Sequence, residues 1–322
     1  MPFLPCRPNE TVLLPALGGM PASVHVIDED SILAVDAALA TGRPLLVRGE
    51  PGTGKSQLAR AAAAALNRAF VHHSVDGRTE TRDLLFTVDA VARLAMAQVM
   101  GALGSMDRGE IMRRIDILEF VQPGPLWWAF DWDSAREQAN RLGVSEPLTP
   151  EGFQPEHGVV VLVDEIDKAD AAIPNGLLDA LGHGRFDVPG RKEAVTRKPE
   201  PSPLVVITTN EERSLPDAFL RRCLVLHLAL PEDRGALIDV LVARGRPHFP
   251  TCGAAVLTKA AELLAKDRDD YRRQDLAPPG LAEYIDLVHA VTGQRSAEQE
   301  QLELLDRVAK FALRKHPPEQ GR

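Results

Sequence analysis

A glycine-rich stretch between an apolar run and an alanine-rich segment constrains this chain more than any other feature. It reads Gly49-Glu50-Pro51-Gly52-Thr53-Gly54-Lys55-Ser56 and matches the pattern G-x-x-x-x-G-K-[ST] at each fixed position. The composition around it predicts a strand over Pro44 to Val47 and a helix over Gln57 to Asn67. Glycines let successive backbone N–H groups face a phosphate, and the helix N-terminus adds positive potential. We therefore expect a phosphate-binding loop rather than an ordinary glycine-rich turn.

The loop pattern also indicates a role for its polar side chains. Lys55 is expected to reach the β- and γ-phosphates of a nucleotide, and the Ser56 hydroxyl is expected to ligate magnesium. ATP and Mg²⁺ are therefore the expected cofactors. The residues expected to contact the nucleotide are Gly49, Gly52, Thr53, Gly54, Lys55, Ser56 and Gln57.

A pair of carboxylates follows a second apolar run and completes the predicted chemistry. Val159 to Val163 is continuously apolar, and Asp164 and Glu165 come directly after it. Asp164 is placed to hold the metal, while Glu165 can act as general base or orient an attacking water. Asp167 and Lys168 are expected to form a solvated helix start instead.

The order of apolar segments predicts an α/β fold followed by a helical region. Short apolar runs alternate with helical stretches in the first part, which is typical of a parallel sheet covered by helices. No strand-like run follows Pro231, so we expect domains over residues 1–230 and 231–322, with inserts over about 76–122 and 131–157. The expected strands are Pro44 to Val47, Phe70 to Ser74, Val159 to Asp164, Leu204 to Thr208 and Cys223 to Leu228, and the expected late helices are Asp233 to Ala243, Ala254 to Lys266, Pro279 to Val291 and Ala297 to Leu313.

Composition narrows the class of protein. The 322 residues are 44% hydrophobic and 26% charged, which is typical of a soluble globular protein, and no apolar run is long enough to cross a bilayer. The net charge of −9 argues against a nucleic-acid partner, because the field of the chain repels phosphate. The three scattered cysteines and the lack of an export leader lead us to expect a reduced, cytoplasmic protein.

Two further motifs make the chain resemble an AAA-plus ATPase. Asn210 ends the apolar run from Leu204 and matches the polar residue called sensor 1 in that family, so the resemblance implies that it positions the lytic water beside Glu165. The segment Leu215 to Cys223 resembles the one that ends in an arginine finger, with Arg222 at the usual position and Arg221 beside it. Which of the two arginines is the finger stays open.

Within that family, the chain is most similar to the MoxR-type branch. Phe120 to Leu126 resembles the branch's glycine-proline-leucine signature, and the stretch from Asp76 lies where the branch inserts an extra element. Arg185 to Val188 and Glu193 to Thr196 could pair as the hairpin that precedes sensor 1. No residue matches the basic sensor 2 of the lid well enough to assign it.

The resemblance implies an AAA-plus core with a helical lid, and hydrolysis of ATP that drives remodelling of a protein partner. It further implies a head-to-tail ring, a hexamer, and a partner with a von Willebrand factor A domain. A small-molecule kinase, a nucleotide-switched scaffold and a DNA-acting motor are the alternatives. The kinase has no need of Asn210 or Arg222, the scaffold would lack the water-activating Glu165, and the motor conflicts with the acidic charge.

Three expectations concern residues outside these motifs. The pair Trp127-Trp128 is expected to pack in the core or an interface rather than to stack on bases, because no basic cluster surrounds it. His72-His73 is expected to be structural, since it has no partner at ligand spacing. The inserts are expected to bind the protein partner, so that trimming 131–157 would abolish partner association but leave ATP binding intact.

Overall fold

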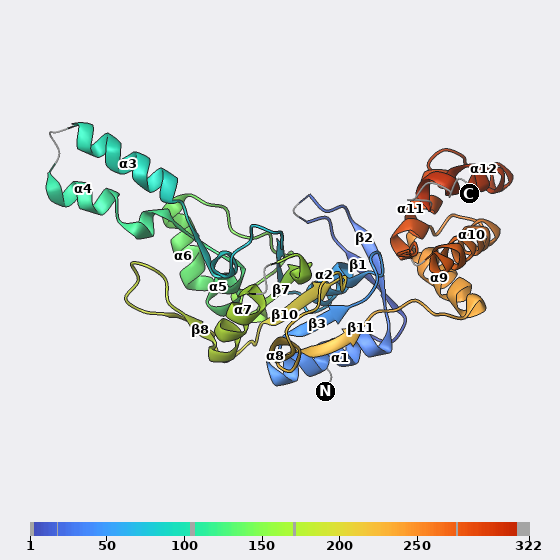
Figure 1. Ribbon diagram of the computed structural model, residues 1–322, viewed down its shortest axis with the longest axis horizontal. Coiled ribbons are helices and arrows are strands. Elements are labelled where there is room, and N and C mark those ends of the chain that lie inside the picture. Colours follow the sequence, from blue (N-terminus) through green and yellow to red (C-terminus); the bar gives the residue numbers. More distant parts are fainter. Residues whose placement is uncertain (1–2, 18, 104–106, 170–171, 275, 314–322) are drawn as a thin grey trace. The chain divides into compact units, whose positions relative to one another are not determined.

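The computed structural model describes residues 3–17, 19–103, 107–169, 172–274 and 276–313 (Figure 1). The chain forms two compact units, and each is described by itself. The first unit contains the residues up to Pro5 together with Ile32–Leu46 and Ala62–Val225. The second contains Cys6–Ser31, Val47–Ala61 and the residues from Leu226 onward.

A five-stranded sheet carries the core. Its strands are β3 (Leu45–Arg48), β4 (Ala69–Ser74), β7 (Val159–Asp164), β10 (Leu204–Thr209) and β11 (Leu224–His227), in the order β11-β3-β10-β7-β4. β7 runs parallel to both β4 and β10, and Val160 lies opposite Phe70 on one side and Leu204 on the other. All of β10 and the first five residues of β7 are buried, as continuous apolar runs require of a strand covered on both faces. The predicted parallel sheet with flanking helices is confirmed.

Aromatic side chains of α5 (Pro125–Phe130) fill the first unit's core. This helix packs against β4 and β7, and Trp127 and Trp128 are 0% and 5% exposed. The Trp127 indole N–H donates to the Ser134 hydroxyl at 2.8 Å, which satisfies its only polar group. The expectation that the tryptophan pair is a packing feature is confirmed.

The insert over 131–157 begins with a helix that the polar composition did not predict. α6 (Trp132–Leu142) buries Trp132, Ala135 and Ala139, and the Trp132 ring lies 4.9 Å from that of Trp128 in an edge-on arrangement. Removal of this segment would therefore open the core of the first unit, which makes the expected trimming experiment a poor test of partner binding.

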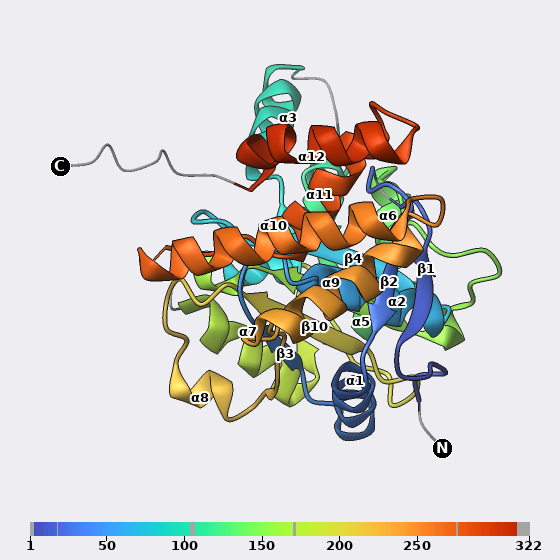
Figure 2. The ribbon, with the colours of Figure 1, turned by 90° about the vertical axis from the view of Figure 1, so that its right-hand side faces the viewer.

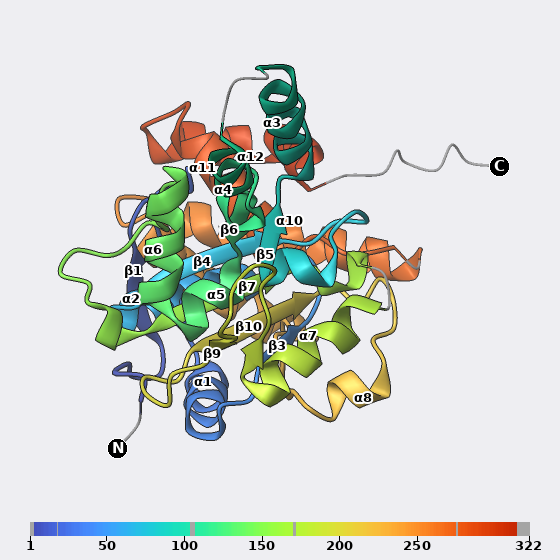
Figure 3. The ribbon, with the colours of Figure 1, turned by 90° about the vertical axis from the view of Figure 1, so that its left-hand side faces the viewer.

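The insert over 76–122 is largely helical and rises from a pair of strands. β5 (Phe86–Val88) and β6 (Val121–Pro123) pair antiparallel at its base, and α3 (Ala90–Leu103) and α4 (Arg108–Arg114) form a helical hairpin between them. Figures 1 and 3 show α3 and α4 side by side, leading away from the strands of the first unit.

The hairpin predicted before Asn210 is confirmed by β8 (Arg185–Phe186) and β9 (Val195–Thr196). Seven other elements complete the chain before the C-terminal helices and the elements described next. They are η1 (Thr81–Leu84), η2 (Ile117–Phe120), η3 (Pro155–His157), η4 (Ile166–Lys168), α7 (Ala172–His183), α8 (Asp217–Leu220) and α1 (Glu29–Thr41).

The four predicted C-terminal helices lie in the second unit (Figure 2). The buried face of the second helix includes Leu257, Ala261 and Leu264, which recur at helical spacing. The same unit holds the start of α2 (Lys55–Ala65) and an antiparallel strand pair, β1 (Glu10–Leu14) and β2 (Ser23–Ile27), that the sequence did not predict. The four helices are α9 (Arg234–His248), α10 (Ala254–Arg273), α11 (Leu281–Thr292) and α12 (Glu298–Ala312).

Candidate active site

The phosphate loop of the second unit has a backbone that only glycine can adopt. Gly49, Gly52 and Gly54 have φ values of 149°, 75° and 97°, in the region that favours glycine. A Cβ atom on Gly49 would lie 2.1 Å from the carbonyl oxygen of Leu228, and one on Gly52 would lie 3.2 Å from the Cβ of Ala282. The loop is therefore shaped by close backbone approach, and α2 begins at Lys55 directly after it.

Polar side chains of the loop form hydrogen bonds to its own backbone carbonyls. The Lys55 ammonium is 7% exposed and donates to the carbonyl oxygens of Gly49 at 2.8 Å and Glu50 at 2.9 Å. Thr53 is buried and its hydroxyl donates to the Glu50 carbonyl, while the Gln57 side chain accepts a bond from Ser23. This loop suits the triphosphate of a nucleotide, because it combines a buried ammonium, positive-φ glycines and the N–H groups of a helix N-terminus. The Ser56 hydroxyl supplies the kind of oxygen ligand that Mg²⁺ prefers.

A buried arginine of α10 lies against this loop, and the sequence analysis missed it. Arg268 is 1% exposed, and its guanidinium donates to the Glu50 carboxylate at 2.8 Å and to the Pro279 carbonyl at 2.6 Å. The N–H of Ala282 also donates to the Gly52 carbonyl at 3.1 Å. Arg268 lies four residues after Leu264 on the buried face of α10, and this spacing was the signal that could have identified it.

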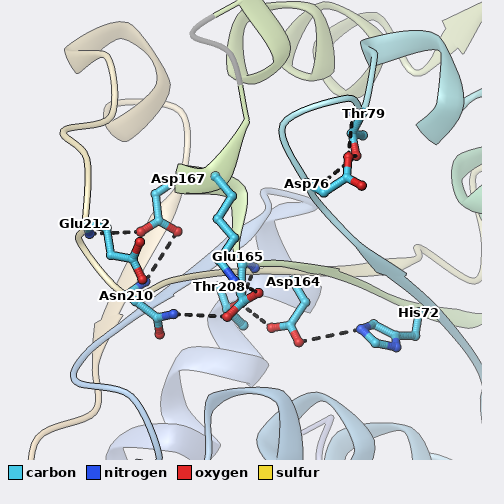
Figure 4. Close-up of polar contacts among 10 residues, drawn as sticks. His72, Asp76, Thr79, Asp164, Glu165, Asp167, Thr208, Asn210 and Glu212 are labelled. Carbon is cyan, nitrogen blue, oxygen red and sulfur yellow. Dashed lines mark hydrogen bonds and ion pairs between the residues drawn. The ribbon is translucent and has the colours of Figure 1, made fainter. Parts of the chain in front are cut away.

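The carboxylates of the first unit lie where β7 ends (Figure 4). The buried Thr208 hydroxyl donates to Asp164 Oδ1 and accepts from the Glu165 N–H at 2.9 Å, so one side chain of β10 fixes both residues. Glu165 has φ 60° and ψ 49°, a left-handed conformation that costs a non-glycine residue about 1–2 kcal/mol. The surrounding hydrogen bonds hold this conformation, as is common at functional sites.

Both oxygens of the Glu165 carboxylate have a donor. Asn210 Nδ2 donates to Oε1 at 3.2 Å, so the structure brings together the two residues that the family resemblance implies lie beside one water molecule. The Lys168 ammonium contacts Oε2 at 2.5 Å, and this hydrogen bond raises the pKa of Lys168. A carboxylate oriented in this way can hold a water molecule or accept its proton once the lysine moves aside.

Asp167 has a structural task that the sequence analysis did not predict. It is 3% exposed, and its carboxylate accepts from the backbone N–H groups of Asn210 at 3.4 Å and Glu212 at 3.0 Å. The expectation of a solvated helix start is therefore wrong for this residue. Asp167 is a positioning residue, because it holds the backbone that carries the Asn210 amide.

His72 makes a contact that the sequence analysis did not predict. Its Nε2 lies 3.5 Å from Asp164 Oδ2, and the side chain is 35% exposed (Figure 4). This contact joins β4 to the carboxylate that ends β7, and the structural role expected of His72 stays a prediction. His73 points to a different environment, where burial is the main cause that lowers its pKa.

Arg221 and Arg222 are both exposed at the end of α8, so the structure does not distinguish between them as the finger. Arg43 holds their backbone through hydrogen bonds. Its guanidinium donates to the carbonyl oxygens of Arg221 at 2.5 Å, Arg222 at 3.1 Å and Cys223 at 3.1 Å. Burial raises the pKa of the Cys223 thiol to about 12, so that residue is a packed, unreactive thiol.

The candidate site thus has two described parts. The carboxylate part joins Asp164, Glu165 and Asn210 through direct contacts and through Thr208. The loop part holds all seven predicted nucleotide contacts on one continuous turn and helix start. A shared magnesium ion between Ser56 and Asp164 stays a prediction.

We compared the chain with known protein families, sequences and structures. A family model described as an AAA domain of the dynein-related subfamily matches residues 44–223. Among solved structures, the chain is similar to a proposed ATPase from Cytophaga hutchinsonii, at 15% identity over 88% of this chain and 79% of that one, with a TM-score of 0.37. It is also similar to the RuvB Holliday junction branch migration motor of Thermotoga maritima, at 18% identity over 87% and 67%, with a TM-score of 0.41. No curated protein sequence matches the chain, and among the described residues no helix has the length and apolar character to span a membrane.

Proposed function

Because the chain belongs to the AAA domain family, in its dynein-related subfamily, and is an ATP hydrolase, we propose that it uses magnesium-dependent ATP hydrolysis to remodel a protein partner from within a ring of its own copies. We assign it to the MoxR-type branch, with a nucleotide-binding core over residues 1–230, a helical lid over 231–322 and a cytoplasmic location. The observation that carries the hydrolytic proposal is the 3.2 Å contact between Asn210 Nδ2 and Glu165 Oε1.

Each residue of the proposed reaction has a distinct task. ATP supplies the phosphoanhydride bond, and magnesium neutralises charge on its phosphates. Lys55 and the loop N–H groups bind those phosphates, and Ser56 and Asp164 are the proposed metal ligands. Glu165 accepts a proton from the attacking water at its carboxylate, while the Asn210 amide fixes the orientation of that carboxylate. Lys168 contacts the other oxygen at 2.5 Å, so water activation requires that this ion pair opens.

Two substitutions test this assignment. Lys55→Ala should lose nucleotide binding, because the phosphates lose their cation. Glu165→Gln should bind ATP normally and lose turnover, because an amide does not accept the proton of water. Fluorescent nucleotide titration and phosphate release measure the two properties separately. Wild-type turnover in Glu165→Gln would refute the role of this carboxylate, and no phosphate release from the wild-type protein would favour the nucleotide-switched scaffold.

The ring proposal rests on the exposed arginines after α8. A guanidinium at the surface can stabilise phosphate charge only in the site of another subunit, and head-to-tail contacts that close form a ring, which we propose to be a hexamer. Arg222→Ala should bind ATP and hydrolyse it slowly. Mixing it with Lys55→Ala should restore part of the activity, since each variant supplies what the other lacks. No rescue in a mixture that still assembles would refute a finger acting between subunits.

We restrict the partner proposal to one insert. Residues 131–142 contribute buried side chains to the first unit, whereas the 76–122 insert carries exposed apolar ones. We propose that the 76–122 insert binds the remodelled protein, and that this protein bears a von Willebrand factor A domain. A binding assay with such a domain, with the insert shortened at α3 and α4 and β5 and β6 retained, tests the proposal.

A further inference from the structure

The Lys168 ammonium holds one oxygen of the carboxylate to which we assign the water proton. Its Nζ lies 2.5 Å from Glu165 Oε2, while Asn210 Nδ2 donates to Oε1 at 3.2 Å. The two donors differ in charge. An amide orients the carboxylate and leaves its charge in place, whereas an ammonium stabilises the negative charge that the carboxylate loses when it takes a proton. Proton transfer from water is therefore opposed while the lysine contact is closed.

The contact has the properties of one that opens easily. The Lys168 and Glu165 side chains are 43% and 31% exposed, and the residues are three positions apart. Ion pairs at this exposure contribute little net stability, because water screens the charges and two long side chains lose freedom. Glu165 is also held by Asn210, so the lysine, with its flexible four-carbon stem, is the partner that moves.

A second carboxylate lies close enough to receive the ammonium. The hydrogen bond to Glu165 is the main cause that raises the pKa of Lys168, and the charges of Glu165, Glu212 and Asp167 act in the same direction. Asp167 is 3% exposed, and its carboxylate already accepts from backbone N–H groups, including that of Glu212 at 3.0 Å (Figure 4). Glu212 itself is exposed, and its carboxylate has no ion pair among the described residues. Glu212 is thus the acceptor that remains when the lysine leaves Glu165.

We propose that Lys168 is a positioning residue that restrains hydrolysis, and that its ammonium exchanges between Glu165 and Glu212. When the ammonium is on Glu212, the Glu165 carboxylate is oriented by Asn210 alone and can accept a proton. The reaction is the one proposed above: the water oxygen bonds to the terminal phosphorus, the bond to the ADP oxygen breaks, and Glu165 takes the proton of the water. The role of Lys168 rests on that assignment of Glu165.

A supporting role for Lys168, in which it helps to orient Glu165 as Asn210 does, makes the opposite prediction. Loss of a helpful donor lowers turnover, whereas loss of a restraining cation raises it. The sign of the change in kcat therefore distinguishes the two roles. A merely structural contact would change stability and leave kcat as it is.

Phosphate release by variants of Lys168 tests the proposal. Lys168→Met keeps the apolar stem and removes the charge, and kcat should rise about twofold to sixfold with the KM for ATP unchanged, which is the factor by which an exposed ion pair favours its closed form plus one. Lys168→Arg keeps a cation and should remain close to wild type. The matched control is Lys198→Met, which removes a lysine paired with Asp133 at 2.7 Å elsewhere in the first unit and should turn over as the wild type does.

Two further measurements test the exchange and the contact. Glu212→Gln removes the second acceptor and should lower kcat by up to about twofold, because the ammonium spends more time on Glu165. It should have no effect when combined with Lys168→Met, since no ammonium is left to move. Limited labelling with acetic anhydride, followed by mass spectrometry, reads the contact without turnover: Glu165→Gln should speed the labelling of Lys168 and leave that of Lys198 unchanged.

Four outcomes would overturn the proposal. The first is a kcat in Lys168→Met that is equal to or below that of the wild type, and the second is a Lys168→Arg variant as fast as Lys168→Met. The third is a Glu212→Gln effect that persists when Lys168 is methionine. The fourth is an unchanged labelling rate of Lys168 in Glu165→Gln. Failure of the hydrolytic proposal has a different appearance, because neither the wild type nor Lys168→Met would release phosphate, and the restraint would then fall with it.

Discussion

Replacement of Arg268 by methionine should destabilise the second unit by about 3 kcal/mol. The guanidinium is 1% exposed and makes a 2.8 Å ion pair with Glu50 and a 2.6 Å hydrogen bond to the Pro279 carbonyl. Removal of one partner of a buried pair typically costs about 3–5 kcal/mol. The Glu50 side chain is 38% exposed and regains water when the arginine is lost, which lowers the cost. Methionine replaces most of the apolar stem, so the loss reports the polar contacts rather than a cavity.

Thermal unfolding without nucleotide measures this loss. A cost of about 3 kcal/mol lowers the melting temperature by roughly 6–12 °C in a domain of this size class. Glu50→Gln keeps an acceptor for Arg268 and should cost only about 1 kcal/mol. The two substitutions should be non-additive, with a coupling of about 1 kcal/mol, because they remove the same contact and the double variant loses no more than Arg268→Met does. Additive losses, or an unchanged melting temperature in Arg268→Met, would refute the reasoning that this pair holds α10 on the phosphate loop.

Two further predictions concern the carboxylate part of the site and the pH dependence of stability. Thr208→Val removes the hydroxyl that bonds both Asp164 and Glu165, so phosphate release should fall about tenfold and stability by about 1–3 kcal/mol, whereas Thr208→Ser should remain close to wild type; equal activity in both variants would contradict a role for the hydroxyl. Burial is the main cause and the charge of Arg244 the second that lower the pKa of His25 from 6.5 to about 4. Between these two pH values the unfolded chain therefore binds a proton at His25 and the folded chain does not. The free energy of unfolding should be unaffected by this group above pH 6.5 and should fall by up to about 3 kcal/mol as the pH drops toward 4. Urea titrations of wild type and His25→Gln between pH 7 and 4.5 measure it, and parallel pH profiles would show that His25 is not the cause.

The sequence predicts most accurately the elements whose burial is complete. Val159 to Val163 is apolar at every position because β7 is covered on both faces, and its boundaries match the prediction. The phosphate loop is equally readable, since its glycines are required by backbone geometry rather than by distant contacts. The pairs β1 with β2 and β5 with β6 were missed, because half-exposed short strands carry a weak apolar pattern.

The contacts that the sequence analysis missed depend on register between distant segments. His72 contacts Asp164 only because β4 pairs with β7 so that Ser74 lies opposite Asp164. Asp167 is buried because the chain after β10 folds over it, 43 residues further on. Neither contact has a local signature in the sequence. Arg268 is different, since its spacing from Leu264 placed it on the buried face of α10.

The guanidinium of Arg43 binds the segment from Arg221 to Cys223 through main-chain carbonyls. Its three acceptors belong to Arg221, Arg222 and Cys223, and a carbonyl oxygen is the same whichever side chain its residue bears. These three hydrogen bonds therefore do not depend on which side chains residues 221 and 222 carry. Alanine at either position should remove a positive charge and leave the bonds to Arg43 in place, so the contribution of each arginine can be measured separately.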